Sequence, residues 1–194
     1  MTPHSSGQRP PSAPHASASV ADASGAALLR MAIGDDAVAV AIDDVREILE
    51  VGRLTALPRT PDFVRGVMNL RGAVVPVIDL VARLGHPPAQ IGRRSCVVVV
   101  ESAPQTDDSA DTKAEADGPH AETLVVGLLV DAVYEVFDAP PGDFEPVPQL
   151  GTRIDASYLR GMSRVRGEVI GVLALERVLA QHELGALIAS HMPH

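Results

Sequence analysis

The sequence predicts a mainly β protein in which two similar small units pack against each other. Short apolar runs bounded by Gly, Pro or charged residues recur along the chain, a pattern typical of small β-barrels. A segment of 23 residues also repeats at a spacing of 95 residues. Hydrophobic residues make up 46% of the chain and aromatic residues only 3%, so the core must consist mainly of Val, Ile, Leu and Ala.

The first two strands are predicted to form a hairpin. Apolar residues fill 28–33 and 37–42, and the Gly34-Asp35-Asp36 sequence between them is typical of a turn. Pro76 lies inside a later apolar run and has no N–H group for a ladder, so we expect that strand at a sheet edge or a bulge. The further predicted strands cover residues 66–69, 73–78, 95–100, 124–130 and 169–173.

Helical segments are predicted to be few and short. One or two turns are expected at 43–48, and another at 80–84 with Asp79 as the N-cap. A terminal helix is expected from Leu175 to about residue 188. Strands therefore dominate the predicted fold.

Three segments are expected to lie outside the folded core. Residues 1–27 contain 7 Ala, 6 Ser, 4 Pro and 2 Gly, a composition typical of a disordered tail. Residues 102–121 have no strand pattern of their own and indicate a disordered loop. The stretch from Glu101 to Glu122 carries seven acidic residues against one lysine, which accounts for -6 of the net charge of -9. The predicted domain covers 28–189, interrupted by the acidic loop at 102–121, with a tail at 190–194.

The internal repeat is the strongest sign of organisation. Residues 63–85 align with 158–180, and a weaker echo aligns 42–48 with 130–136. Each unit is too small to bury a good core alone, so the two should pack together, and the groove between them is the expected binding site. The eight identical pairs of the stronger repeat are Arg65/Arg160, Gly66/Gly161, Arg71/Arg166, Gly72/Gly167, Val74/Val169, Val77/Val172, Leu80/Leu175 and Leu84/Leu179.

Several enzyme classes lack the residues that they need. Lys113 is the only lysine, so no Walker A, Schiff-base or receiver-domain lysine is available. Cys96 is the only cysteine, so neither an internal disulfide nor a thiolate metal site can form. No HExxH, HxH or GxSxG motif occurs. We therefore expect a protein that is not an enzyme and that binds no cofactor and no metal.

The sequence also predicts where the protein works. No apolar run approaches the about 20 residues that span a bilayer, and the N-terminus lacks a charged region followed by an apolar one. A single cysteine fits a reducing compartment. We expect a cytoplasmic protein without direct membrane insertion.

Five arginines lie at predicted turns of the two repeats, and for any one of them a solvated turn residue explains the position as well as a binding residue does. Arg71 stands apart because the sequence from Asn69 to Gly72 joins two predicted strands, and Gly72 permits the positive φ of a tight turn. Its guanidinium should project from a rigid hairpin. The five are Arg65, Arg71, Arg160, Arg164 and Arg166.

These runs resemble a known family. The sequence from Ile42 to Ile48, and above all Gly-Val-x-Asn-Leu-Arg-Gly-x-Val-x-Pro-Val-x-Asp-Leu from Gly66 to Leu80, resembles the CheW-like domains. The run from Gly127 to Val133 is similar to the signature of the family's second half, so the resemblance covers about residues 28–179.

The resemblance implies a fold of two packed SH3-like five-stranded β-barrel subdomains with a few short helices. It also implies a non-enzymatic adaptor that couples the cytoplasmic tip of methyl-accepting chemoreceptors to the regulatory domain of a CheA-type histidine kinase in chemotaxis. Such an adaptor is cytoplasmic and is recruited to membrane-associated receptor arrays.

The resemblance also assigns candidate site residues. Three match the family's kinase-docking surface, and three match its receptor-coupling region, in which Arg71 is the coupling arginine and Gly66 a structural glycine. The sequence departs from the family at the N-terminal tail, at the acidic insertion and at Ala174, where many members have an acidic residue. The kinase-docking candidates are Ile42, Val45 and Glu47, and the receptor-coupling candidates are Arg71, Gly66 and Asn69.

Two other functions are weighed against this one. An adaptor of a non-motility chemosensory pathway, which controls a second messenger, surface attachment or development, would have the same sequence features. A small-barrel nucleic-acid-binding protein would need a basic face with stacking aromatic residues, whereas this chain has three Phe, two Tyr and a nearly neutral domain. The sequence therefore predicts no nucleic-acid partner.

Overall fold

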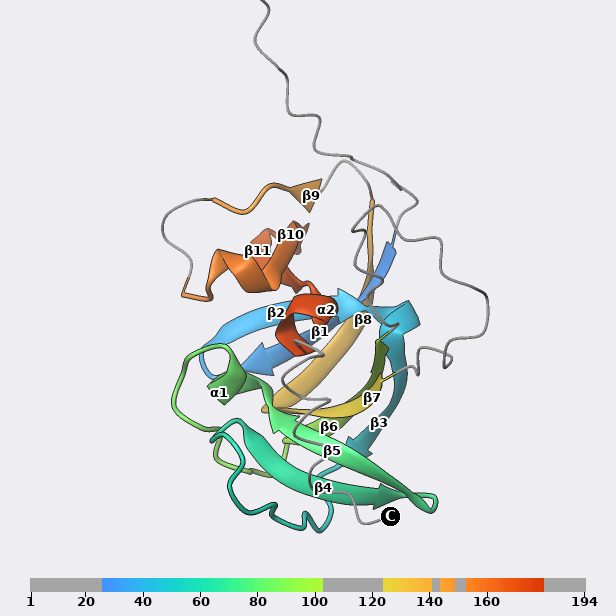
Figure 1. Cartoon of the computed structure of the whole chain (residues 1–194). Helices are drawn as coiled ribbons and strands as arrows, with labels where there is room; N and C mark the ends of the chain where they lie inside the picture. The colour runs from blue at the N-terminus through green and yellow to red at the C-terminus, as the bar shows by residue number, and fades with distance from the viewer. Residues whose placement is uncertain (1–25, 103–123, 141–143, 149–152, 180–194) are drawn as a thin grey trace, which may run out of the picture.

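A computed structural model describes residues 26–102, 124–140, 144–148 and 153–179 of the chain. The described residues form two β-sheets with a few short helices (Figure 1). We define the first lobe as the five-stranded sheet β3-β6-β7-β5-β4 with helix α1, and the second lobe as the six-stranded sheet β8-β1-β2-β11-β10-β9 with helix α2.

The bounds of the elements follow the chain closely. The strands of the first repeat and its helix are β1 (Ala26–Ile33), β2 (Asp36–Ala41), β3 (Val45–Glu50), β4 (Val64–Leu70), β5 (Ala73–Asp79) and α1 (Leu80–Arg83). Those of the second repeat are β6 (Cys96–Ser102), β7 (Leu124–Val130), β8 (Ala132–Ala139), β9 (Phe144–Glu145), β10 (Leu159–Val165), β11 (Glu168–Leu173) and α2 (Leu175–Leu179). Two 3-10 helices, η1 (Ile42–Asp44) and η3 (Ala156–Tyr158), precede β3 and β10.

The two repeats exchange their hairpins. The β1–β2 hairpin pairs with β8 and, in parallel, with β11, which both belong to the second repeat. The β6–β7 hairpin pairs in the same way with β3 and β5 of the first repeat. Apart from the extra strand β9, the strand order of the two sheets is therefore identical when each strand is replaced by its repeat equivalent. Each lobe contains strands from both repeats.

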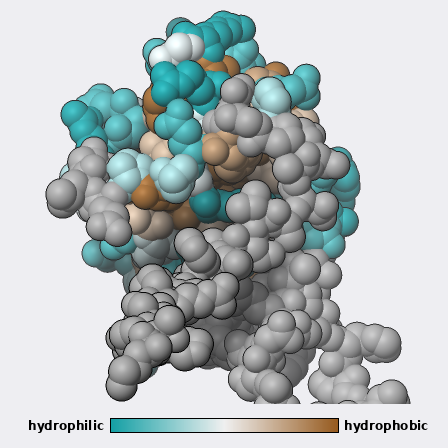
Figure 2. All heavy atoms as spheres, turned by 90° about the horizontal axis from the view of Figure 1, so that it is seen from above, coloured by the Kyte–Doolittle hydropathy of each residue, from teal (hydrophilic) through white to brown (hydrophobic). Residues whose placement is uncertain are grey.

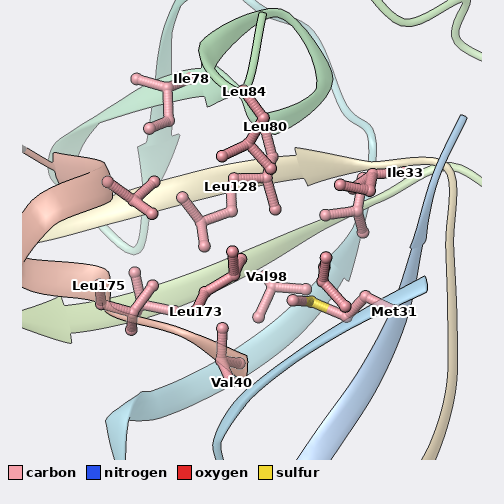
Figure 3. Close-up of a cluster of buried hydrophobic side chains, with 14 of the residues drawn as sticks. Met31, Ile33, Val40, Ile78, Leu80, Leu84, Val98, Leu128, Leu173 and Leu175 are labelled. Carbon is pink, nitrogen blue, oxygen red and sulfur yellow. The ribbon is translucent and has the colours of Figure 1, made fainter. Parts of the chain in front are cut away.

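A shared apolar core lies between the sheets. Side chains from both sheets and both helices point toward one another in this core (Figure 3), and most of them are aliphatic, as the composition predicts. Two smaller clusters belong to one sheet each. The largest fully buried side chains of the shared core are Met31, Ile33, Ile78, Leu80, Leu128 and Leu179.

Arg83 joins the two lobes near this core. Its guanidinium lies 4.7 Å from the ring centroid of Phe63 and 5.7 Å from that of Tyr158, two aromatic residues at equivalent positions of the repeat. Its Nε donates a hydrogen bond of 2.7 Å to the backbone oxygen of Val178, the repeat equivalent of Arg83 itself. One cation therefore contacts corresponding points of both repeats.

The mainly β fold class is confirmed, and so is the short helix capped by Asp79, whose Oδ1 accepts a hydrogen bond of 3.1 Å from the Ala82 N–H group. Strand β1 begins at Ala26, two residues before the predicted start of the domain. Four predictions concern residues outside the described part of the chain: the tail at 1–25, the loop at 103–121, the helix beyond Leu179 and the tail at 190–194.

Two structural predictions are wrong. The helical turns expected at 43–48 are a 3-10 turn followed by strand β3, in which exposed and half-buried residues alternate from Val45 to Glu50. The edge position expected for the strand with Pro76 is wrong, since this strand is β5, which lies inside its sheet between β7 and β4, but a bulge, the other expected setting, lies beside it, where β4 shifts register opposite Val77 and Ile78. Pro76 is tolerated there because the parallel ladder with β7 begins one residue later, at Val77, so the missing N–H group interrupts no pairing with β7.

Candidate docking surface

The turn between β4 and β5 has the tight geometry that the sequence predicts. Arg71 and Gly72 both have positive φ, 53° and 93°, as a two-residue hairpin turn of type I′ requires. Asn69 stabilises this turn, since its Oδ1 accepts a hydrogen bond of 3.0 Å from the Gly72 N–H group. A left-handed conformation is costly for an arginine, so the flanking residues hold it in place.

The guanidinium of Arg71 is exposed and paired. Its side chain is 80% exposed, and Nη2 lies 2.9 Å from Oε2 of Glu47, which is 20% exposed on strand β3. The structure thus brings together one kinase-docking candidate and one receptor-coupling candidate in a single ion pair. An exposed pair of this kind contributes at most about 1 kcal/mol to stability, so it leaves Arg71 available to a partner.

Gly66 shapes the hairpin. Its φ is 132°, and a Cβ atom at this position would lie 2.2 Å from the backbone oxygen of Thr55. Thr55 and Val67 exchange two backbone hydrogen bonds here, of 2.9 and 2.8 Å, and the β4–β5 register shifts between Val64 and Gly66. Gly66 therefore permits the close approach of two backbones and contributes no side chain to a partner.

Ile42 and Val45 face inward. Both are half-buried and pack against the shared core, Ile42 from η1 and Val45 from β3. The exposed apolar side chains near them are Ile48 on β3 and Val74 on β5, which were not among the candidate site residues. The register of β3 with β6 shifts between Val45 and Glu47, so Ile48 lies on the same side of β3 as Val45, and the sequence carries no signal for this bulge.

A hollow of 590 Å³ lies beside Arg71 in the first lobe. Its floor is apolar, with Val75, Val99 and Val125 beneath the charged rim. The sequence predicts a groove between the two repeats. The hollow lies instead within the first lobe, because the shared core fills the contact between the two sheets. We call the residues at the rim of this hollow the first face: Arg46, Glu47, Arg71 and Val74.

A buried carboxylate connects the hairpin to the loop that follows α1. Asp79 is fully buried, its Oδ2 accepts a hydrogen bond of 2.8 Å from the Ala89 N–H group, and Nη1 of Arg65 lies 3.7 Å from the same oxygen. Arg65 is therefore turned inward, unlike Arg71. The signature residues Asp79 and Arg65 hold the loop after α1 against the hairpin.

The second lobe repeats the ion pair. Arg166 and Gly167 have φ values of 48° and 84° in the β10–β11 turn, and Arg166 Nη2 lies 2.6 Å from Glu135 Oε2. Glu135 is the echo equivalent of Glu47, and Arg166 is the repeat equivalent of Arg71. The sequence contains both alignments, but only the fold shows that they bring the same two charges together twice.

Two titratable groups in the described part of the chain have pKa values that burial shifts. Burial raises the pKa of the Cys96 thiol, so the thiol stays protonated and is a poor nucleophile. Burial is the largest cause of the raised pKa of Asp44. The charge of Arg160 lowers this pKa, and those of Glu176 and Asp43 raise it. Among the described residues no His, Cys, Asp and Glu side chains cluster in a way that could hold a metal ion. None of the described helices is long and apolar enough to cross a membrane.

Figure 2 shows the molecule from above, where small hydrophobic areas lie between hydrophilic residues on the described part of the surface. The site itself lies at the β4–β5 turn, where the pair of Glu47 and Arg71 beside the aliphatic floor of the hollow is suited to contact with other proteins. The fold and the site thus define a class: a small two-lobed β protein that presents charged hairpin turns flanked by aliphatic side chains.

The chain belongs to the family of the CheW-like domain, whose model matches residues 27–183. A probable chemotaxis protein CheW of Rhizobium etli is 33% identical over 80% of this chain and 88% of its own length. Protein FrzA of Myxococcus xanthus is 32% identical over 76% of this chain and 81% of its own length. The crystal structure of the scaffolding protein TtCheW from Thermoanaerobacter tengcongensis matches with a TM-score of 0.62 and 27% identity, over 77% of this chain and 88% of that one.

Proposed function

We propose that this protein is a non-enzymatic adaptor that couples methyl-accepting chemoreceptors to a CheA-type histidine kinase. Membership of the CheW-like family supports the adaptor class, and relatives named as chemotaxis proteins support the pathway. Its partners would be the regulatory domain of the kinase and the cytoplasmic tip of the receptors, which would recruit it to receptor arrays.

The observation that carries this proposal is the ion pair between Arg71 and Glu47 on the first face. The guanidinium projects from a turn held by Asn69 and Gly72, so its position is fixed before a partner arrives. Receptor tips are helical hairpins that can offer carboxylates, and a guanidinium can form paired hydrogen bonds with such groups. Arg71 would contact the receptor through one side of its guanidinium, while the other side stays paired with Glu47.

Kinase docking would use the same strand. Val45 and Ile42 pack against the core, Glu47 points toward the hollow beside Arg71, and Ile48 is exposed on the other side of β3. A change in Arg71 would reach the kinase-facing strand through one hydrogen-bonded contact with Glu47. Coupling between the two partners therefore needs no movement of the lobes.

A second candidate is an adaptor of a chemosensory pathway with an output other than swimming. Two relatives with other names favour it: Protein FrzA of Myxococcus xanthus, and Protein PilI of Pseudomonas aeruginosa, which is 31% identical over 72% of this chain. The receptor and kinase contacts would be the same in both cases. The output of the kinase in the native organism distinguishes the two.

The first experiment reverses the charge of Arg71. In a mixture of receptor signalling domains, kinase and this protein, we expect Arg71→Glu to abolish receptor control of kinase activity while direct kinase binding persists. Loss of a charged contact of this kind typically weakens binding by about 30-fold or more. The matched control is Arg166→Glu, which makes the same change at the equivalent turn of the second lobe. Equal effects of the two reversals, or no effect of Arg71→Glu, would contradict the assignment.

A double variant separates direct contact from an internal role. Glu47→Arg combined with Arg71→Glu restores opposite charges across the 2.9 Å pair but leaves the wrong charge toward the receptor. We expect receptor control to remain absent. Its recovery would show that Arg71 acts only by holding Glu47.

A further inference from the structure

The connection between β6 and β7 is far longer than the fold requires. In the second lobe the equivalent hairpin, β1–β2, closes through the two residues Gly34 and Asp35. In the first lobe the last residue pair of the hairpin is Ser102 with Leu124, so residues 103–123 stand in the place of that short turn. We call them the acidic segment, because one lysine stands against six acidic side chains: Asp107, Asp108, Asp111, Glu115, Asp117 and Glu122. The pairing of the strands explains neither the length nor the charge of this segment.

Both ends of the acidic segment leave the sheet beside the first face. Val125, the second residue of β7, lines the hollow that lies next to Arg71. Glu101 pairs with Val125 across the ladder, one residue before β6 ends. The segment is therefore tethered at the edge of the same hollow whose rim carries the guanidiniums of Arg46 and Arg71.

The acidic stretch that includes this segment already contributes one carboxylate to the rim. Glu101 is the first acid of the stretch, and its Oε2 lies 3.1 Å from Nε of Arg46, with the two side chains 41% and 53% exposed. Arg71 is 80% exposed and donates to Glu47 through one nitrogen. A guanidinium has five N–H donors, so both arginines retain donors for further carboxylates.

The length of the acidic segment suits this contact. Glu122 stands two positions before Leu124, and Asp107 stands five positions after Ser102. An extended chain spans at most about 3.5 Å per residue, so these two carboxylates can reach about 7 Å and about 17 Å from the sheet. A group on such a short tether has an effective concentration of about 1 mM or more, and six carboxylates share it. Even weak ion pairs therefore bring the segment to the two arginines.

We propose that the acidic segment occupies the hollow of the first face, where its carboxylates bind Arg46 and Arg71. Its charge selects this position, because the hollow beside its two ends has guanidiniums at the rim. A carboxylate of any partner needs the same guanidiniums, so the segment competes with that partner. For the receptor contact of Arg71, this consequence rests on the proposed function. In the second lobe the equivalent hairpin closes in two residues, so no such segment is tethered at that hairpin.

The first test uses the full chain alone, without kinase or receptor, so that its outcome is independent of the proposed coupling. Nuclear magnetic resonance spectra at low salt compare the wild type with a variant in which each acid of the segment is replaced by its amide. We expect the backbone and Nε signals of Arg71 and the backbone signal of Val125 to move. The matched control is Arg166, at the equivalent turn of the second lobe, whose signals should stay. The variant combines Asp107→Asn, Asp108→Asn, Asp111→Asn, Glu115→Gln, Asp117→Asn and Glu122→Gln.

Three outcomes of this comparison would overturn the proposal. Unmoved signals of Arg71 would mean that the segment does not occupy the hollow. Equal movement at Arg71 and Arg166 would reveal only the change in overall charge. Movement confined to Arg93 and Arg94, which are exposed on the loop before β6, would place the segment on another surface.

A synthetic peptide supplies the segment as a separate molecule. A peptide of residues 103–123, at a concentration of about 1 mM or more, should return the signals of Arg71 in the amide variant toward their wild-type positions. The control is a peptide with the same six amides, which should move nothing. Equal effects of the two peptides, or no effect of either, would contradict a contact through carboxylates.

A last measurement separates this contact from the proposed function. An occupied site lowers the apparent affinity for a competitor, so the amide variant should bind the receptor signalling domain about threefold or more tightly than the wild type does. If the spectra change and this affinity does not, the competition is overturned, and with it the receptor role of Arg71, whereas the contact of the segment stands. If the spectra do not change, the contact is absent and the proposed coupling function is unaffected.

Discussion

The two lobes repeat their backbone more faithfully than their side chains. In each lobe the residue just before the helix donates a backbone hydrogen bond to the aromatic position of the repeat: Asp79 N–H to the Phe63 oxygen at 2.6 Å, and Ala174 N–H to the Tyr158 oxygen at 2.9 Å. The carboxylate of Asp79 has no counterpart at Ala174, although both positions are fully buried. Main-chain hydrogen bonds set the shared geometry, and side chains adapt each lobe to its surroundings.

The difference at these positions has a local cause. In the first lobe α1 is followed by a loop that returns to the sheet, and Asp79 anchors that loop through the Ala89 N–H group. In the second lobe Ala174 packs in the core, and its backbone oxygen accepts from the Arg177 and Val178 N–H groups at 3.0 Å. The departure of Ala174 from the family pattern is therefore compatible with an intact helix start.

The largest expected effect comes from replacing the glycine at the register shift of each hairpin, Gly66 in the first lobe and Gly161 in the second. Gly66→Ala should destabilise the fold by about 3 kcal/mol or more, because the added Cβ meets the Thr55 backbone oxygen at 2.2 Å and φ is 132°. Gly161→Ala should cost about 1 kcal/mol, since the added Cβ meets the Phe144 ring at 3.1 Å and the Glu145 backbone oxygen at 3.2 Å, and each must give by only a few tenths of an ångström. Urea unfolding measures both, and equal losses would show that the two bulges are equally tight.

Removing the Asp79 carboxylate makes the first lobe resemble the second. We expect Asp79→Ala to lower the free energy of unfolding by about 2–3 kcal/mol, because the Ala82 N–H group loses its cap and the buried Ala89 N–H group its acceptor. Asp79→Asn keeps one acceptor oxygen and should lose less. A loss as small as that of an exposed substitution would mean that the loop after α1 does not depend on this anchor.

The smallest expected effect concerns Asp44, whose echo equivalent in the second lobe is the uncharged Ala132. Burial raises the pKa of Asp44, so the folded state favours its protonated form, and stability falls as pH rises through the folded pKa. Asp44→Asn should therefore be more stable than wild type near neutral pH, by less than about 1 kcal/mol. The advantage should vanish below the ordinary carboxyl pKa of 3.8.

Unfolding curves at several pH values test the sign, and Asp43→Asn at the neighbouring exposed position is the control. An advantage of Asp44→Asn that grows at acid pH would contradict the role of burial. Loss of attraction to Arg160 in the variant works in the opposite direction, which is why the expected gain is small.

Much of the fold follows from local sequence, and the rest depends on distant pairing. The hairpin turns at Gly34 and Gly72 and the cap at Asp79 are local features, and all three were predicted correctly. Strand β3 was predicted as helical turns; its apolar residues Val45, Ile48 and Leu49 have helical spacing, and only in the fold does exposure alternate along the strand. The exchange of hairpins has no local signal, because it depends on which strands meet.

The candidate site shows the same division. The turn that presents Arg71 could be predicted, whereas its ion pair with Glu47 joins residues 24 positions apart on non-adjacent strands. Ile42 and Val45 were selected by resemblance, and only the fold shows that they pack against the core while Ile48 is exposed. The roles of all six candidate residues in binding stay predictions.

The exchange of hairpins also constrains how the chain folds during its synthesis. The β1–β2 hairpin leaves the ribosome with two free strand edges, which pair with β8 and β11 from the later part of the chain. The first lobe in turn waits for β7, which follows the acidic segment. Neither lobe can therefore close when its first strands emerge, and the second lobe closes only after β11, at the expense of folding speed and of exposed strand edges in the meantime.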